Sequence, residues 1–159
     1  MKLPLERWLG RAAGVAGDRA GNAMIEFALG SGILVMAFVG TFQFGYTFLQ
    51  YNSLENAVAR GARYASLIPY DSTSTAPSGA FSSAVKNMVL YGSSSAGSSP
   101  ALPGLTTANV NLTVTFTNGV PGTMTVSISG YTINAVVASA TLTNKPKITY
   151  AYQGIWAPE

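Results

Sequence analysis

One carboxylate of this chain stands in an unusual place for a charged group. Glu26 directly precedes a stretch, Phe27 to Leu54, that contains no Asp, Glu, Lys or Arg. An acid drawn to the centre of a membrane costs about 2.5–3.5 kcal/mol, and less near the interface, so Glu26 favours a cationic partner. A cut after Gly21 would supply one, because the new α-amine of Asn22, with a pKa of about 7.7–8.0, is mostly protonated at neutral pH. The first and fifth residues of a helix lie one turn apart, so this amine could pair with Glu26 of its own chain or of a neighbour. The alternative is an ordinary acid at a helix N-terminus, which the helix dipole favours.

Few other residues could do chemistry. The chain has neither histidine nor cysteine, and the acids between the apolar run and the terminal Glu159 are Glu55 and Asp71. These residues provide no general acid–base pair, no Ser–His or Cys arrangement and no set of metal ligands. We therefore expect no enzyme, no cofactor, no metal and no small-molecule substrate. The net charge of +3, without a basic stripe, also argues against nucleic acid.

One short sequence motif leaves a catalytic function as an alternative. Ser83 and Lys86 form an S-x-x-K sequence like that of serine penicillin-binding enzymes. The companion S-D-N and K-T-G elements are missing, and a Ser-rich chain produces such a spelling easily by chance. A hydrolase using these two residues is the weakest of the alternatives.

The apolar run predicts a membrane anchor. Phe27 to Tyr51 holds 25 uncharged residues, which is about 37 Å of helix at about 1.5 Å per residue. A bilayer core needs about 20 residues, whereas the apolar part of a secretory signal has about 7–15. The sequence therefore predicts one spanning helix rather than a signal peptide.

The flanking charges predict the orientation of this helix. More basic residues precede the run than follow it closely, which places the N-terminus in the cytoplasm. Those before it are Lys2, Arg7, Arg11 and Arg19, and those after it are Arg60 and Arg63. Tyr46 and Tyr51 stand near the far end, where an aromatic belt is expected.

Beyond the membrane the helix is expected to continue in amphipathic form. Apolar residues recur at helical spacing and polar residues occupy the other faces. The apolar stripe consists of Leu54, Ala57, Val58, Ala62 and Ala65. The helix should end near Leu67, because Pro69 discourages continuation. The stripe could pack on the chain's own module, on neighbouring chains, or on both.

The remainder predicts a small extracytoplasmic module of α+β class. Residues 80–91 have the spacing of an amphipathic helix. Residues 110–117 and 124–129 alternate apolar and polar side chains as strands do, with a hairpin loop at Asn118–Gly122 between them. A third strand is expected around Ile148, Tyr150 and Tyr152.

The remaining segments predict two connections and one stretch that is open to two interpretations. Residues 69–78 are rich in Ser, Thr, Ala and Pro and indicate a linker, and residues 92–100 indicate a flexible loop. The apolar segment 133–142 is compatible with a short helix on the sheet or with a contact surface. The predicted architecture is a long N-terminal transmembrane and amphipathic helix packed on a small antiparallel sheet, as in pilins.

Three segments in a fixed order resemble a known family. Gly21 is followed by four residues and then by Glu26-Phe27, an aromatic-Gly segment follows at Gln43–Tyr46, and Asn56–Ala65 ends in Gly-Ala-Arg-Tyr-Ala. Together they resemble TadE-like pseudopilins, minor subunits of the tight-adherence (Flp, type IVb) pilus system. The resemblance covers about residues 21–66, and the rest of the chain is similar only in general character.

The resemblance implies a processed pilus subunit. A prepilin peptidase would cut between Gly21 and Asn22, Glu26 would act in subunit assembly, and Phe27 would help position the site. Residues 1–21 would be a removed cytoplasmic leader, 22–67 the transmembrane and extended amphipathic helix, and 68–159 the periplasmic module. The expected location is the bacterial inner membrane, with possible incorporation into an adhesive pilus.

The implied partners are the prepilin peptidase, membrane lipid, other pilins and pseudopilins, and the inner-membrane assembly platform. The bulky module favours a minor role in starting, capping or supporting the pilus over that of the much shorter major pilin. The competing interpretation is an uncleaved, single-pass anchored module for extracytoplasmic binding or adhesion.

Overall fold

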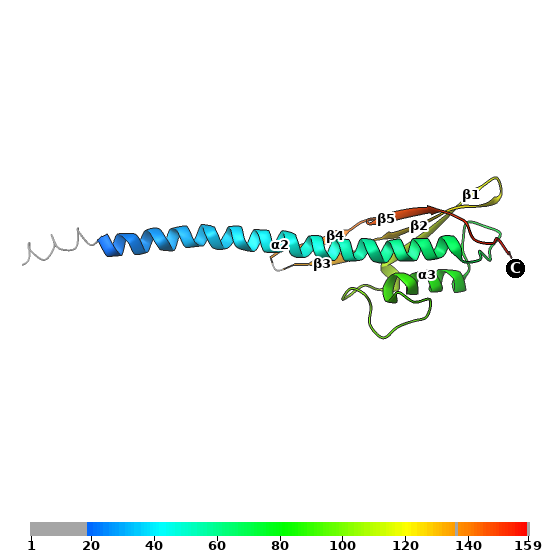
Figure 1. Cartoon of the computed structure of the whole chain (residues 1–159), viewed down its shortest axis with the longest axis horizontal. Coiled ribbons are helices and arrows are strands. Elements are labelled where there is room, and N and C mark those ends of the chain that lie inside the picture. The colour runs from blue at the N-terminus through cyan, green and yellow to red at the C-terminus, as the bar shows by residue number, and fades with distance from the viewer. Residues whose placement is uncertain (1–18, 136, 159) are drawn as a thin grey trace, which may run out of the picture. The chain divides into compact units, whose positions relative to one another are not determined.

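The structure is a computed structural model that describes residues 19–135 and 137–158 (Figure 1). The predicted leader, residues 1–21, therefore lies almost wholly outside the described residues. The chain forms two compact units that divide in the sequence between Phe42 and Gln43. The first unit contains the beginning of helix α2 (Arg19–Leu67), and the second contains the rest of this helix with everything that follows.

Helix α2 ends at Leu67, where the sequence predicts its end. The last helical-type bond is donated by the Ile68 N–H to the Tyr64 carbonyl, at 3.2 Å. Pro69 disfavours the helical conformation for the residue before it and has no N–H to continue the ladder. The predicted long apolar helix and α+β class are confirmed.

The predicted apolar stripe is the helix's contribution to the core of the second unit. Leu54, Ala57, Val58, Ala62 and Ala65 are all 0% exposed. They belong to one hydrophobic cluster with buried residues of helix α3 (Gly79–Tyr91) and of the strands. Intramolecular packing thus accounts for the stripe.

Helix α3 has clear signals at both of its ends. The Ser78 hydroxyl accepts a hydrogen bond from the Phe81 N–H at 3.0 Å, which satisfies one of the free donors of the first turn. At the other end, Gly92 adopts a left-handed conformation (φ 70°) and donates its N–H to the Met88 carbonyl at 3.0 Å. The predicted helix over residues 80–91 is confirmed.

A three-stranded antiparallel sheet has the order β1-β2-β5 (Figure 1). Its strands are β1 (Val110–Thr117), β2 (Val120–Ile128) and β5 (Lys147–Ala151). The hairpin loop is shorter than predicted, because Asn118 and Gly119 alone make the turn with φ of 54° and 82°. Val120 and Pro121 already pair with β1, and Gly122 falls where the register shifts as a bulge.

Residues 133–142 are not a helix. They lie in an antiparallel hairpin of β3 (Tyr131–Asn134) and β4 (Ser139–Leu142). Tyr131 and Ile133 are buried, and the hydroxyl groups of Thr132 and Thr141 pair across the strands at 2.9 Å on the other face. This alternation is the β pattern, which the run of small apolar residues in the sequence concealed.

The prediction of a linker after Pro69 is wrong for the first residue of that segment, Tyr70. Tyr70 is fully buried, and its ring contacts that of Phe81 at 5.1 Å. The Tyr70 N–H donates to the Ile155 carbonyl at 2.9 Å, and the Tyr70 carbonyl accepts from the Ala157 N–H at 3.0 Å. The composition of the segment indicates a linker, but a single aromatic residue attaches it to the C-terminal segment.

The hydroxyl group of Tyr152 joins three parts of this region. It accepts a hydrogen bond from the Tyr70 N–H at 2.8 Å. It also lies within donor distance of the carbonyl oxygens of Ile68 (3.0 Å) and Ile155 (2.8 Å). Burial raises the pKa of Tyr152 above the usual 10.0, because the phenolate would lose its hydration.

We predict that Gly61→Ala destabilises the second unit by about 1–3 kcal/mol, as overpacking does. A Cβ at Gly61 would lie 2.2 Å from Cγ2 of Val89, a stiff β-branched side chain in the core. Thermal unfolding of the full chain in detergent, followed by near-ultraviolet circular dichroism, measures the effect. Gly79→Ala is the control, since a Cβ there meets nothing within 4 Å. The double variant Gly61→Ala/Val89→Ala should be less destabilised than the sum of the single variants, and additive effects would contradict the predicted clash.

We predict that Tyr152→Phe costs about 1–3 kcal/mol at pH 7, since the Ile68 carbonyl loses its hydroxyl donor and the Tyr70 N–H loses one of its two acceptors. Because the folded-state pKa of Tyr152 is raised, its contribution is complete below pH 10 and is lost as pH rises through the folded pKa. The variant should therefore lose less stability than the wild type as the pH rises above 10, in the same unfolding assay. Tyr150→Phe, at an exposed residue of β5, should change stability by less than about 0.5 kcal/mol. Equal effects of the two substitutions would contradict the bonding role of Tyr152.

Candidate membrane and assembly site

The described part of the first unit exposes a continuous apolar surface. Ten of its large apolar side chains are 55–78% exposed. They are Met24, Ile25, Phe27, Leu29, Ile33, Leu34, Val35, Met36, Phe38 and Phe42. The helix is long and apolar enough to cross a membrane, and its most apolar part is not buried within the protein. An apolar surface of this extent requires lipid or other helices around it, which supports membrane anchoring through this candidate spanning helix.

The polar side chains within this apolar stretch have partners on their own helix. The Ser31 hydroxyl donates to the Ala28 carbonyl, and the Thr41 hydroxyl donates to the Ala37 carbonyl, each at 2.9 Å. Hydrocarbon offers no partner to a hydroxyl, so these intrahelical bonds lower the cost of placing Ser and Thr in lipid.

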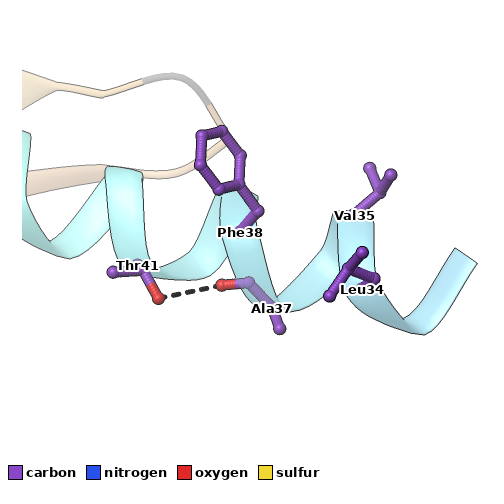
Figure 2. Close-up of a pocket in the computed structure, with 5 residues that line it drawn as sticks. All are labelled: Leu34, Val35, Ala37, Phe38 and Thr41. Atoms are coloured by element: carbon purple, nitrogen blue, oxygen red, sulfur yellow. Dashed lines mark hydrogen bonds between the residues drawn. The ribbon is translucent and has the colours of Figure 1, made fainter. Parts of the chain in front are cut away.

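A shallow hollow on this helix is lined by Leu34, Val35, Ala37, Phe38 and Thr41 (Figure 2). All five belong to α2, and the one polar side chain among them, Thr41, already bonds to the Ala37 carbonyl. The hollow therefore has no free polar group to orient a small polar ligand. Its chemistry suits an acyl chain or the side chains of another helix.

The four predicted site residues lie in the first turns of α2. The Asn22 side-chain Nδ2 donates to Glu26 Oε1 at 3.3 Å, so these two residues share one face of the helix. Phe27 is 78% exposed and forms part of the exposed apolar surface. The bond between Gly21 and Asn22 lies inside the helix, which begins at Arg19.

The residue pair of the alternative hydrolase lies on helix α3. Ser83 is exposed and Lys86 is partly buried. Across residues 19–135 and 137–158, no three His, Cys, Asp or Glu side chains gather as a metal site.

Sequence reasoning missed the role of Gln43. Its Nε2 donates to the Ala138 carbonyl at 2.9 Å, and its Oε1 accepts from the Val137 N–H at 2.9 Å. The side chain thus holds the tip of the β3–β4 hairpin through two bonds. The available signal was an amide side chain well inside a long apolar run, which must find partners if water is excluded.

Within residues 19–135 and 137–158, geometry and composition define a protein with a candidate membrane-spanning helix and a small α+β module. The family model described as TadE-like protein matches residues 21–63. No curated protein and no solved structure matches the chain. The predicted resemblance to the TadE-like family is confirmed over this segment, which contains the apolar run and most of the buried stripe. The chain is thus similar to a protein associated with the tight-adherence pilus.

We predict that arginines at two exposed positions of the apolar surface abolish stable anchoring. Leu34→Arg/Phe38→Arg should cost about 6 kcal/mol of insertion, at about 3 kcal/mol for each charge. The fraction of protein that remains in membranes after extraction at alkaline pH measures anchoring. The matched control is Leu67→Arg/Ile155→Arg, which changes two exposed apolar residues of the second unit. Full retention of the Leu34/Phe38 variant would show that this segment does not span.

Proposed function

We propose that this chain is a minor pseudopilin that supports assembly of a tight-adherence pilus after its leader is removed. The observation that carries the proposal is the TadE-like match over residues 21–63, the segment with Gly21, Glu26 and the apolar helix. The proposed setting is the bacterial inner membrane, with the N-terminus cytoplasmic and the second unit periplasmic, as the flanking charges predict.

Processing would begin with a local opening of the helix. The Gly21–Asn22 bond lies within the first turn of α2, and a peptidase must reach an extended backbone. Glycine at position 21 lowers the cost of unwinding, since Gly is about 1 kcal/mol less favourable than Ala in a helix. A small residue before the bond also leaves room for the approaching enzyme.

The new N-terminus would give Glu26 a charged partner. The Asn22 side chain already reaches Glu26 at 3.3 Å, so one helical turn brings the two residues into contact. After cleavage, the Asn22 ammonium group would place a positive charge close to Glu26. The free N–H groups of the new first turn would lie at the same end of the helix and add to this positive charge. In lipid this pair would form within one subunit or between adjacent subunits, and it would favour packing of α2 against other pilin helices.

The second unit supports a minor role rather than a shaft role. Tyr70, Tyr152 and the C-terminal segment lock the module to the end of the helix, so every copy would carry the complete module. A few copies can be accommodated at the tip or base of a fibre built from much shorter subunits. The proposed partners are other pilins and pseudopilins, the assembly platform and the prepilin peptidase.

One observation favours the competing function of an uncleaved anchored module. In the uncut chain, Glu26 already accepts a hydrogen bond from Asn22, so removal of the leader is not required to give the carboxylate a partner. An uncleaved protein would use the second unit for binding outside the cytoplasm and would leave its N-terminus at Met1.

We predict that protein purified from membranes of its native host begins at Asn22. The N-terminal residue and the intact mass measure this directly. Gly21→Leu, or deletion of the host's prepilin peptidase, should leave the chain starting at Met1. A wild-type chain that starts at Met1 in cells with active peptidase would refute the pseudopilin and leave the anchored module.

The assembly role of Glu26 is tested separately from cleavage. Glu26→Gln should still be cut, whereas its recovery with sheared pili or with partner pilins should fall at least about tenfold, or about 1.4 kcal/mol. Glu55→Gln is the matched control, because Glu55 is an exposed acid of the same helix within the second unit. Equal recovery of the two variants would remove Glu26 from the assembly mechanism.

A further inference from the structure

The tip of the β3–β4 hairpin is hydrogen-bonded to a part of helix α2 that belongs to the uncharged run. Gln43 lies within the uncharged run, yet its side chain holds the backbone of Val137 and Ala138 through two bonds of 2.9 Å. The hairpin therefore extends along the helix as far as the residue where the second unit begins (Figure 1). The hairpin is a separate two-stranded sheet and does not pair with the main sheet of β1, β2 and β5.

The length of the uncharged run is explained if this hairpin meets the bilayer. Twenty uncharged residues, from Phe27 to Tyr46, suffice to cross a hydrocarbon core of about 30 Å. The uncharged run continues to Leu54, well beyond that requirement. Gln43 therefore lies within one helical turn of the far end of the shortest possible span, at the depth where hydrocarbon gives way to headgroups.

The surface around the tip is apolar and exposed. Val137 is 71% exposed although it is a large aliphatic residue of the second unit. On α2, Phe44 directly follows Gln43 and is 74% exposed, and its ring stacks on that of Phe48 at 6.3 Å. Leu49 is exposed as well. Exposed aromatic and aliphatic side chains at this level are typical of residues that enter the interface of a membrane.

The described backbone groups of the tip need little water. The Ala135 N–H bonds to the Ala138 carbonyl at 3.2 Å, and the Val137 N–H bonds to Gln43 Oε1. The Ala138 carbonyl also accepts from Gln43 Nε2. Irregular backbone is tolerated near hydrocarbon where protein groups satisfy it, so these bonds make the described groups of Ala135, Val137 and Ala138 more compatible with a dry surrounding.

The charges nearest to the hairpin in the sequence have the sign that suits lipid headgroups. Lys145 and Lys147 are exposed and follow the base of the hairpin, whereas no acid occurs between residues 72 and 158. Four-residue strands extend about 13 Å, so cations at the base would lie on the water side of a tip held in the interface. Anionic headgroups attract such cations.

We propose that the β3–β4 tip and the turn of α2 around Gln43 are embedded in the interface of the membrane leaflet that faces the module. The partner of this surface is lipid, and Gln43 is the positioning residue that holds the hairpin at that depth. The proposal depends on membrane anchoring and not on leader cleavage, so it survives if the protein proves to be an uncleaved module.

Because the chain has no native cysteine, a single introduced cysteine can carry a fluorophore at one chosen position. Val137→Cys and Val120→Cys place one environment-sensitive fluorophore on each of two hairpins of the full chain. Val120 is the matched control, an exposed valine (45%) beside the turn of the β1–β2 hairpin. Both proteins are reconstituted in phosphatidylethanolamine/phosphatidylglycerol vesicles, with and without lipids that carry a nitroxide quencher near the top of the acyl chain, at a low and a tenfold higher protein density.

The proposal expects the Val137 probe to emit at shorter wavelength and to be quenched at least twofold more than the Val120 probe, at both densities. Equal quenching of the two probes would overturn it. A wavelength shift that appears only at high density, without quenching by lipid, would also overturn it and assign the surface to a neighbouring protein subunit.

Gln43→Leu in the Val137→Cys background tests the positioning role. Loss of the two bonds should reduce lipid quenching of the probe by at least half, while near-ultraviolet circular dichroism reports the integrity of the main sheet. Gln50→Leu is the control on the same helix. Unchanged quenching in the Gln43 variant, with the sheet intact, would show that Gln43 does not set the depth of the tip.

Discussion

The removal of apolar helix surface from water is the constraint on which the rest of this structure depends. Helix α2 presents apolar side chains over most of its length, but two different surroundings cover them. In the first unit the surface is exposed on the protein and requires lipid or other helices. From Leu54 onward the protein covers its own stripe with α3 and the strands. One secondary-structure element thus provides both the anchor and the core of the module.

The second unit is closed by contacts between its two ends rather than by disulfides. The chain has no cysteine. The Gln153 N–H donates to the Ser66 carbonyl at 2.9 Å, and the Trp156 indole N–H donates to the Ser72 carbonyl at 3.0 Å. These bonds fix the C-terminal segment against the end of α2. Close packing at Gly61 brings α3 against the same helix, so the helix end is held from two sides.

Polar groups within the apolar run are satisfied in two ways, and the difference carries functional information. Ser31 and Thr41 bond to carbonyl groups of their own helix turn, which any membrane helix allows. The longer Gln43 side chain does not bond to its own helix turn. It bonds instead to a hairpin nearly a hundred residues away in sequence. The family match ends at residue 63, so the hairpin lies outside the part of the chain that the TadE-like comparison covers.

The amino-acid sequence by itself determined the features that depend on local pattern. The absence of charge from Phe27 to Leu54 defined the apolar helix, the 3.6-residue period of Leu54–Ala65 defined its buried stripe, and strict alternation defined β1 and β2. The spacing of Gly21, Glu26 and Phe27 indicated the family. These signals are readable because the period of a helix or strand directly sets which face is buried.

Tertiary structure alone decided the features that depend on partners distant in sequence. Tyr70 looked like part of a linker until the C-terminal segment paired with it, and residues 133–142 looked like a helix or a contact surface until β3 and β4 paired. Gln43 gained its role from a hairpin that no local pattern connects to it. Hydrogen bonds and burial of this kind are set by how separate segments meet in space, and one-dimensional periodicity does not contain that information.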